Sequence, residues 1–99
     1  NPDYSFEIVD LADYVKSKDA MLRLKGRVIG SEGKSRRLIE ELTECNVSVF
    51  GKTISIIGTP DAVANAKQAV ISLLRGSKHS NVYHWLEGRK KELKRRGMM

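Results

Sequence analysis

Apolar and polar residues alternate at the start of the chain. Tyr4, Phe6 and Ile8 are each separated by one polar residue, and a period of two is typical of a half-buried strand whose apolar side faces the core. Residues 11–18 contain three apolar residues at helical spacing but also several polar ones. The pattern at residues 11–18 is compatible with either a turn or a short helix.

Two helical patterns follow, separated by a corner with two glycines. Apolar residues recur at intervals of seven from Asp19, which predicts a helix that stops at Gly30. A new helical stripe begins after Gly33, so the chain is expected to turn sharply between two helices. The first stripe consists of Met21, Leu22, Val28 and Ile29, and the second of Ser35, Leu38, Ile39, Leu42 and Cys45.

Two β-branched runs and a third helix come next. Residues 46–50 and 53–57 are joined by Gly51-Lys52, which predicts a hairpin with a two-residue turn. Thr59-Pro60-Asp61 combines an N-cap residue, a proline at the first helical position and an acid near the positive helix end. The helix that starts there is expected to reach Gly76 as its C-cap.

The last segment predicts a basic helix after a short linker at residues 77–81. Val82, Trp85, Leu86 and Leu93 fall on one side of this helix, and basic residues cover the rest. Tyr83 and Trp85 are expected to anchor it by packing. The predicted fold class is α+β with the element order βααββα and an added C-terminal basic helix.

Positive charge is concentrated in two short blocks. The 99-residue chain has a net charge of +6, and residues 23–37 and residues 88–99 each have a net charge of +5. Residues 1–22 have −3 and residues 38–87 have −1. A basic balance is typical of proteins with a polyanionic partner, and the block at residues 23–37 is expected to contact one. The block at residues 88–99 is open to three interpretations: a solubilising tail, an RNA clamp or a docking helix for a protein partner.

Composition narrows the class of protein further. A single cysteine, Cys45, is expected to be a buried hydrophobe in a reducing, cytoplasmic setting. No apolar run approaches the roughly 18 residues of a membrane span, so no membrane partner is expected.

The chain offers no paired carboxylates or nucleophile–base set, and His79 and His84 lie near no cysteine or acid cluster. We expect no catalysis, metal, cofactor or small-molecule substrate. The Asn1-Pro2 start suggests a piece of a longer protein.

The corner at residues 30–35 can be compared with two phosphate-binding loops. Gly33-Lys34-Ser35 matches the end of a Walker A loop, but that motif needs a glycine where Val28 stands and joins a strand to a helix. A Gly-x-x-Gly turn between two helices instead matches the KH loop, which clamps the backbone of about four nucleotides. Glycines let the backbone approach a nucleic acid closely, and the following helix N-terminus favours anions.

The elements around this corner resemble a type I KH domain from Tyr4 to Gly76. At residues 26–30, 33–42 and 49–53 the chain is similar, more narrowly, to the Dim/Pno/Krr group of small-ribosomal-subunit assembly proteins, in particular to an archaeal member. That group has tandem KH domains, of which this chain resembles the second. The resemblance implies a KH domain at residues 1–76, with three strands packed by three helices, and a linker with a basic helical extension at residues 77–99.

The motif and the charge pattern give the expected RNA-binding residues. They are Arg27, Val28, Ile29, Gly30, Ser31, Glu32, Gly33, Lys34, Arg36, Arg37 and Val49, and a second group for RNA or a partner is Arg89, Lys90, Lys94 and Arg95. Glu32 departs from the general KH pattern, because a carboxylate repels phosphate unless it points away. Arg36 stands where an apolar residue is usual, but the assembly group commonly has arginine there. We expect it to stack on a base or bridge phosphates.

The expected function is single-stranded RNA binding through the KH groove. The resemblance implies small-subunit ribosomal RNA near its 3′ end as the target, during rRNA processing and ribosome biogenesis. It also implies as partners the endonuclease that matures this end and the alpha subunit of translation initiation factor two. The alternative is a protein-interaction module of a ribosome-assembly or translation-initiation complex, in which the basic C-terminal helix docks a partner, and Glu32 favours that alternative.

Overall fold

Three antiparallel strands form one sheet in the order β1-β3-β2. The computed structural model describes residues 3–97, and the strands are β1 (Ser5–Asp10), β2 (Asn46–Phe50) and β3 (Thr53–Gly58). β2 pairs only with β3, so the other side of β2 is an edge of the sheet. The predicted hairpin is confirmed, with Gly51 at positive φ in its turn.

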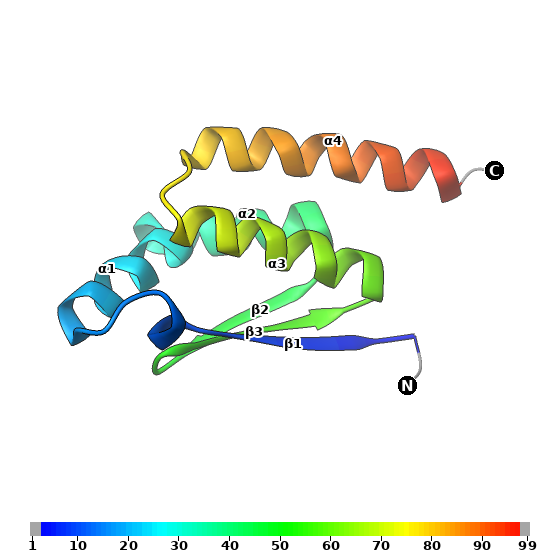
Figure 1. The fold of residues 1–99 in the computed structure, drawn as a ribbon. Coiled ribbons are helices and arrows are strands. Elements are labelled where there is room, and N and C mark those ends of the chain that lie inside the picture. Colours follow the sequence, from blue (N-terminus) through cyan, green and yellow to red (C-terminus); the bar gives the residue numbers. More distant parts are fainter. Residues whose placement is uncertain (1–2, 98–99) are drawn as a thin grey trace.

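Helices cover only one face of the sheet, and the other face is open (Figure 1). Phe6 and Ile8 lie on the open face and are each 53% exposed, and Phe6 is opposite the exposed Ile57. The predicted strand is present, but the expectation that its alternating apolar side faces the core is wrong. Val9, which has the opposite parity, is the buried residue of β1.

The first two helices meet at the predicted corner. α1 (Lys18–Ile29) starts behind Ser17, whose hydroxyl accepts the Ala20 N–H at 3.1 Å, and α2 (Lys34–Thr43) follows a 3-10 turn at Ser31–Gly33. A 3-10 turn at Leu11–Asp13 occupies the segment that the sequence left open. Leu22 is 63% exposed, so this member of the α1 stripe does not pack in the core.

The third helix begins at the predicted signals. α3 (Pro60–Leu74) has Pro60 at its first position, and Thr59 caps it through its backbone without a side-chain hydrogen bond. Arg75 is the C-cap residue rather than Gly76, which follows it with a φ of +101°. From α3, Lys67 donates a hydrogen bond to Glu7 of β1, and this bond and the charge of Glu7 raise the pKa of Lys67.

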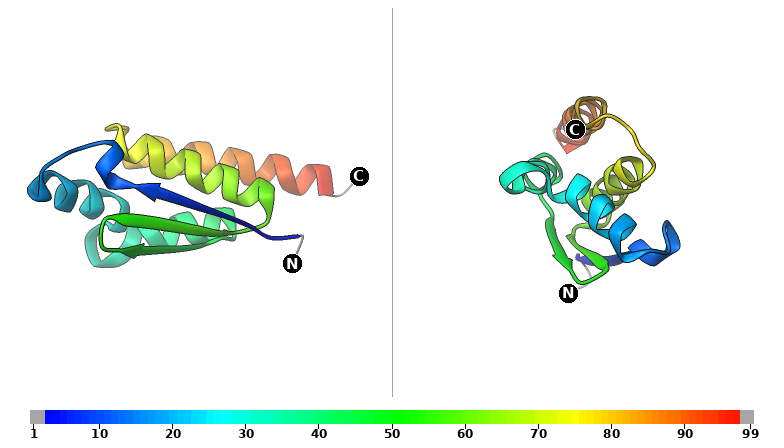
Figure 2. Two further views of the ribbon diagram at one scale, coloured as in Figure 1. Left: turned by 60° about the horizontal axis from the view of Figure 1, so that its bottom comes forward. Right: turned by 90° about the vertical axis from the view of Figure 1, so that its left-hand side faces the viewer.

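The basic extension is a fourth helix, α4 (His79–Gly97). It lies across α2 and α3 on the side away from the sheet, so that the molecule has a sheet, a layer of helices and α4 on top (Figures 1 and 2). Val82 and Leu86 are buried in the same core as the strands. Two expectations are corrected: α4 starts inside the predicted linker, and Trp85, at 42% exposed, is not buried with the other anchors.

The free cysteine is part of this core. Cys45 is buried beyond the end of α2, and burial raises the pKa of its thiol. A Cβ at Gly58 would lie 2.8 Å from its Sγ, so β3 can pass the sulfur only because glycine stands there. None of the helices described between residues 3 and 97 is long and apolar enough to cross a membrane.

Candidate nucleic-acid interface

The corner between α1 and α2 depends on both of its glycines. Gly30 has φ 76° and ψ 176°, a region that only glycine visits readily, and a Cβ there would lie 2.8 Å from the backbone nitrogen of Ser35. Gly33 has φ 74° in the left-handed region. Ser31 and Glu32 lie between the glycines in a 3-10 turn that is irregular, because Glu32 has a φ of 54° and a ψ of 28°.

Arg37 fixes the shape of this loop from α2. Its Nη1 donates to the backbone oxygen of Glu32 at 2.8 Å. Glu32 has a φ of 54° and is exposed. Arg37 therefore holds the loop in its turned conformation while the rest of its charge stays near the loop surface.

A groove of about 290 Å³ lies between this corner and the edge strand. Its lining residues are Ile29, Arg36, Val47, Ser48 and Val49. Ile29 and Val49 supply apolar surface, Arg36 supplies charge, and the β2 edge supplies backbone. An apolar wall with a few placed polar groups is the usual composition of a binding site.

Glu40 ties the charge of the groove to the strand edge. The Nη1 atom of Arg36 donates to Glu40 Oε1 at 3.0 Å and to the Val47 carbonyl at 3.3 Å, and Glu40 Oε2 accepts the Val47 N–H at 2.8 Å. Residues two apart in an edge strand point their backbone groups to the same side. Val49 therefore presents its N–H and C=O to the groove, where they can pair with the polar edge of a base. Sequence reasoning missed Glu40, and its only signal was the i, i+4 spacing from Arg36.

Two predicted RNA-binding residues take structural positions. Val28 is 0% exposed, so its side chain belongs to the core and supports the groove from below. Arg27 donates from Nε to the Leu73 carbonyl at 2.8 Å and from Nη2 to the Ser77 carbonyl. It thus joins the end of α1 to the α3–α4 connection.

The other predicted residues lie around the loop. Ile29, Arg36 and Val49 line the groove, and Gly30, Ser31, Glu32, Gly33, Lys34 and Arg37 form or flank the loop. Their contact with RNA stays a prediction. No group of three or more His, Cys, Asp and Glu side chains among the described residues could hold a metal ion.

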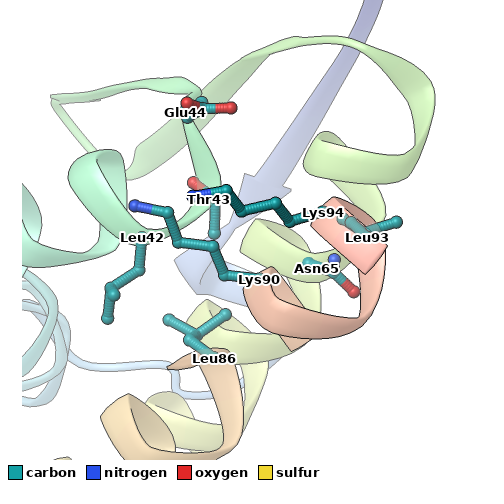
Figure 3. A pocket seen from close by; sticks show the side chains of 8 residues that line it. All are labelled: Leu42, Thr43, Glu44, Asn65, Leu86, Lys90, Leu93 and Lys94. Carbon is teal, nitrogen blue, oxygen red and sulfur yellow. The ribbon is translucent and has the colours of Figure 1, made fainter. Parts of the chain in front are cut away.

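The residues of the second basic group do not line the groove, and they differ from one another in their contacts. Lys90 and Lys94 line a pocket of about 440 Å³ between α4 and the end of α2, toward which both side chains extend (Figure 3). Cations are favoured at a helix C-terminus. Arg89 donates to Asn65 at 3.3 Å and pairs with Glu92 at 3.0 Å. Arg95 is exposed.

The chain belongs to the type I KH-domain family. A family model described as "Eukaryotic type KH-domain (KH-domain type I)" matches residues 5–91. Within this family the chain matches the second KH domain of the pre-rRNA-processing proteins of the PNO1/Dim2 group.

Individual relatives agree with this assignment. A KH domain-containing protein of Methanocaldococcus jannaschii is 50% identical over 94% of this chain and 41% of the relative. The pre-rRNA-processing protein PNO1 of Chaetomium thermophilum is 30% identical over 81% of this chain and 30% of the relative. The chain thus spans less than half the length of these relatives.

Solved structures show the same fold. A crystal structure of a protein of unknown function from Aeropyrum pernix has a TM-score of 0.93 and 40% identity, and covers 97% of this chain and 51% of that chain. The crystal structure of an a/eIF2alpha–aDim2p–rRNA complex from Pyrococcus horikoshii OT3 has a TM-score of 0.84 and 44% identity, and covers 93% of this chain and 50% of the matched chain.

Proposed function

We propose that this domain binds single-stranded RNA in the groove between the Gly30–Gly33 loop and β2. The observation that carries the proposal is the joined network of Arg36, Glu40 and Val47. It fixes a cation beside a strand edge whose next outward backbone groups, on Val49, are positioned to hydrogen-bond a base. Loop amides on one side and base-pairing groups on the other match the two parts of a nucleotide.

The charge around the groove supports the same proposal. Lys34 is exposed at the start of α2, and Arg37 keeps its guanidinium beside the loop. Counterion release at such cations supplies much of the affinity of proteins for nucleic acids. The family assignment adds that KH loops act on the RNA backbone.

The target that we propose is small-subunit ribosomal RNA near its 3′ end, bound during rRNA processing in the cytoplasm. Support comes from the PNO1 relatives, which are pre-rRNA-processing proteins, and from the a/eIF2alpha–aDim2p–rRNA complex, whose aDim2p is similar to this chain. We accordingly include the alpha subunit of translation initiation factor two as a partner. The endonuclease that matures the 3′ end is the further partner implied by the family.

Titration of a labelled rRNA 3′-end oligonucleotide, read by fluorescence anisotropy at several salt concentrations, tests the groove. Ser31→Asp places a carboxylate on the loop and keeps both glycines, and we expect it to weaken binding about tenfold, which is about 1.4 kcal/mol. Gln68→Glu adds the same charge on the exposed side of α3 and is the matched control, expected to bind like the wild type. Equal binding by all three proteins would contradict the groove.

A protein-interaction module is the second candidate function. The observation that favours it is the exposed basic surface of α4, where Lys90, Lys91 and Lys94 form no ion pair with any side chain that the structure describes. An acidic protein surface would complement it. Calorimetric titration with the purified alpha subunit, comparing wild type with Lys91→Glu, tests this candidate. Unchanged affinity in the variant would place the contact elsewhere.

A further inference from the structure

A second pocket, of about 470 Å³, touches the other side of the loop. We call it the α1/α4 pocket. It is lined by Arg23, Gly26, Arg27, Gly30, Ser31, Lys34, Ser35, His79 and Tyr83. It shares no lining residue with the groove, and its volume lies within the roughly 300–1,000 Å³ of small-ligand sites.

One polar group in this pocket lacks a partner. The Ser35 side chain is 2% exposed, and its hydroxyl has no hydrogen-bond partner in the described structure. Buried hydroxyls are almost always satisfied, because an unpaired one is costly. The Gly30 backbone packs closely on Ser35, because a Cβ added at Gly30 would lie 2.7 Å from the Ser35 Cβ. Its oxygen has no accessible surface, so a ligand in the pocket that Ser35 lines bonds this hydroxyl once the side chain turns toward it.

The rim of the pocket is positively charged. Arg23 and Lys34 come from the two helices that flank the loop, and the lining includes no Asp or Glu. Arg27 contributes further charge while two of its donors hold the Leu73 and Ser77 carbonyls. The pocket is therefore suited to an anionic group.

An aromatic wall closes the side formed by α4. His79 Nε2 lies 2.7 Å from the Arg27 carbonyl, and since a carbonyl only accepts, His79 carries its hydrogen there. This bond holds the ring against the end of α1. The Tyr83 ring follows one turn later, with its centroid 6.0 Å from that of His79 and an angle of 58° between the planes. Aromatic side chains beside cations form the usual surface for unpaired bases.

We propose that the α1/α4 pocket binds one further nucleotide of the RNA strand held in the groove. Its phosphate lies at Arg23 and Lys34, its base lies against Tyr83, and the Ser35 hydroxyl bonds a polar atom of the nucleotide. The strand reaches the pocket directly, because Gly30, Ser31 and Lys34 belong both to the loop region and to the pocket lining. This inference rests on the proposed RNA binding and extends it from the groove to the far side of the loop.

RNA length provides the test. The full chain is titrated with single-stranded oligonucleotides of increasing length, from the roughly four nucleotides that fill a KH groove to eight. We expect wild-type affinity to rise by about 5- to 20-fold when the added nucleotide reaches the pocket, as base–aromatic stacking allows. Tyr83→Ala should lose this rise, whereas His84→Ala, its exposed neighbour on α4, should keep it.

Ser35→Ala separates binding from folding. Removing an unpartnered buried hydroxyl should leave the melting temperature unchanged or raise it, yet the same variant should lose part of the length-dependent rise. Arg23→Gln should reduce the slope of log affinity against log salt by about 0.7, the contribution of one phosphate on a single strand. Lys16→Gln, an exposed charge before α1 that lines neither the groove nor the pocket, is its control.

The outcomes distinguish the two proposals. Because Ser31 also lines the pocket, the groove is judged on the four-nucleotide RNA: if Ser31→Asp binds it like the wild type, the groove is wrong, and this inference fails with it. If Ser31→Asp weakens every length but Tyr83→Ala, Ser35→Ala and Arg23→Gln all keep the full rise, the groove stands and the α1/α4 pocket is overturned. The pocket is supported if Tyr83→Ala loses the rise, Ser35→Ala loses part of it and Arg23→Gln lowers the salt slope, while both controls behave like the wild type.

Discussion

The two basic blocks carry the same net charge but are built differently. In residues 23–37, Arg27, Arg36 and Arg37 each donate to at least one backbone carbonyl, so their guanidinium groups have defined positions. In residues 88–97, Arg89 bonds the Asn65 side chain and Glu92, and the lysines extend from an exposed helix face. The fold fixes three guanidinium groups of the first block, whereas Lys90, Lys91 and Lys94 of the second block form no ion pair with any side chain that the structure describes.

This difference suggests that the two blocks have different roles, specific RNA recognition for the first and long-range electrostatic attraction for the second. A guanidinium that is held in place loses little entropy when a ligand binds, so it can favour one geometry over another. Lysines on an exposed helix contribute mainly long-range attraction that salt screens. We therefore assign RNA recognition to the loop and groove, and a general electrostatic or partner-binding role to α4.

The largest effect on stability should come from disrupting the backbone conformation of Gly30 in the first basic block. Gly30→Ala combines a φ of 76° with a Cβ that would lie 2.8 Å from Ser35 N, and we expect it to lower the free energy of unfolding by about 3 kcal/mol. Gly88→Ala is the counterpart in the second block, where a Cβ meets nothing within 4 Å. It should raise stability by about 0.5–1 kcal/mol. Urea denaturation measures the free energy of unfolding of both variants. Similar changes in the two would contradict the claim that the two basic blocks are built differently.

An intermediate effect on stability is expected when the Arg27 guanidinium is replaced. Arg27→Lys loses the paired donors to the Leu73 and Ser77 carbonyls, because an ammonium cannot reproduce the planar fork. We expect a loss of about 1–3 kcal/mol in the free energy of unfolding. Arg95→Lys, on the exposed side of α4, should change it by less than about 0.5 kcal/mol. An unchanged free energy of unfolding in Arg27→Lys would show that the two guanidinium hydrogen bonds do not stabilise the fold.

The smallest effect is expected in the salt dependence of RNA binding when charges of either basic block are removed. Lys34→Gln should weaken binding of a four-nucleotide RNA and reduce the salt slope by about 0.7. The combined change of Lys90, Lys91, Lys94 and Arg95 to Gln should reduce that slope by less, although it removes four charges rather than one. Anisotropy titrations over a salt series compare the two proteins. A larger slope change in the α4 variant would transfer RNA binding to the second block.

The sequence predicted those parts of the fold that depend on local signals. The glycine corner, the Gly51-Lys52 hairpin and the Thr59-Pro60 helix start depend on backbone preferences within a few residues, and all three are present. A period of two predicts a strand but does not say which side is covered. The exposure of Phe6 and Ile8 was therefore not predictable from β1 alone.

The rest of the candidate site depends on contacts between distant residues. His79 was placed in a linker, but its bond to the Arg27 carbonyl spans 52 positions and stands at the start of α4. Glu40 lies off the apolar stripe of α2, so the stripe gave it no role, whereas it bridges Arg36 and Val47. Both side chains acquire their roles from the packing of whole elements, which no local pattern encodes.

The most direct test of the central claim is an NMR titration of the ¹⁵N-labelled chain with a four-nucleotide single-stranded RNA. Binding in the groove predicts amide shift changes at residues 29–34 and 47–49, with residues 88–97 of α4 nearly unchanged. Changes confined to α4, with the loop and the β2 edge unaffected, would contradict the assignment of RNA recognition to the first basic block.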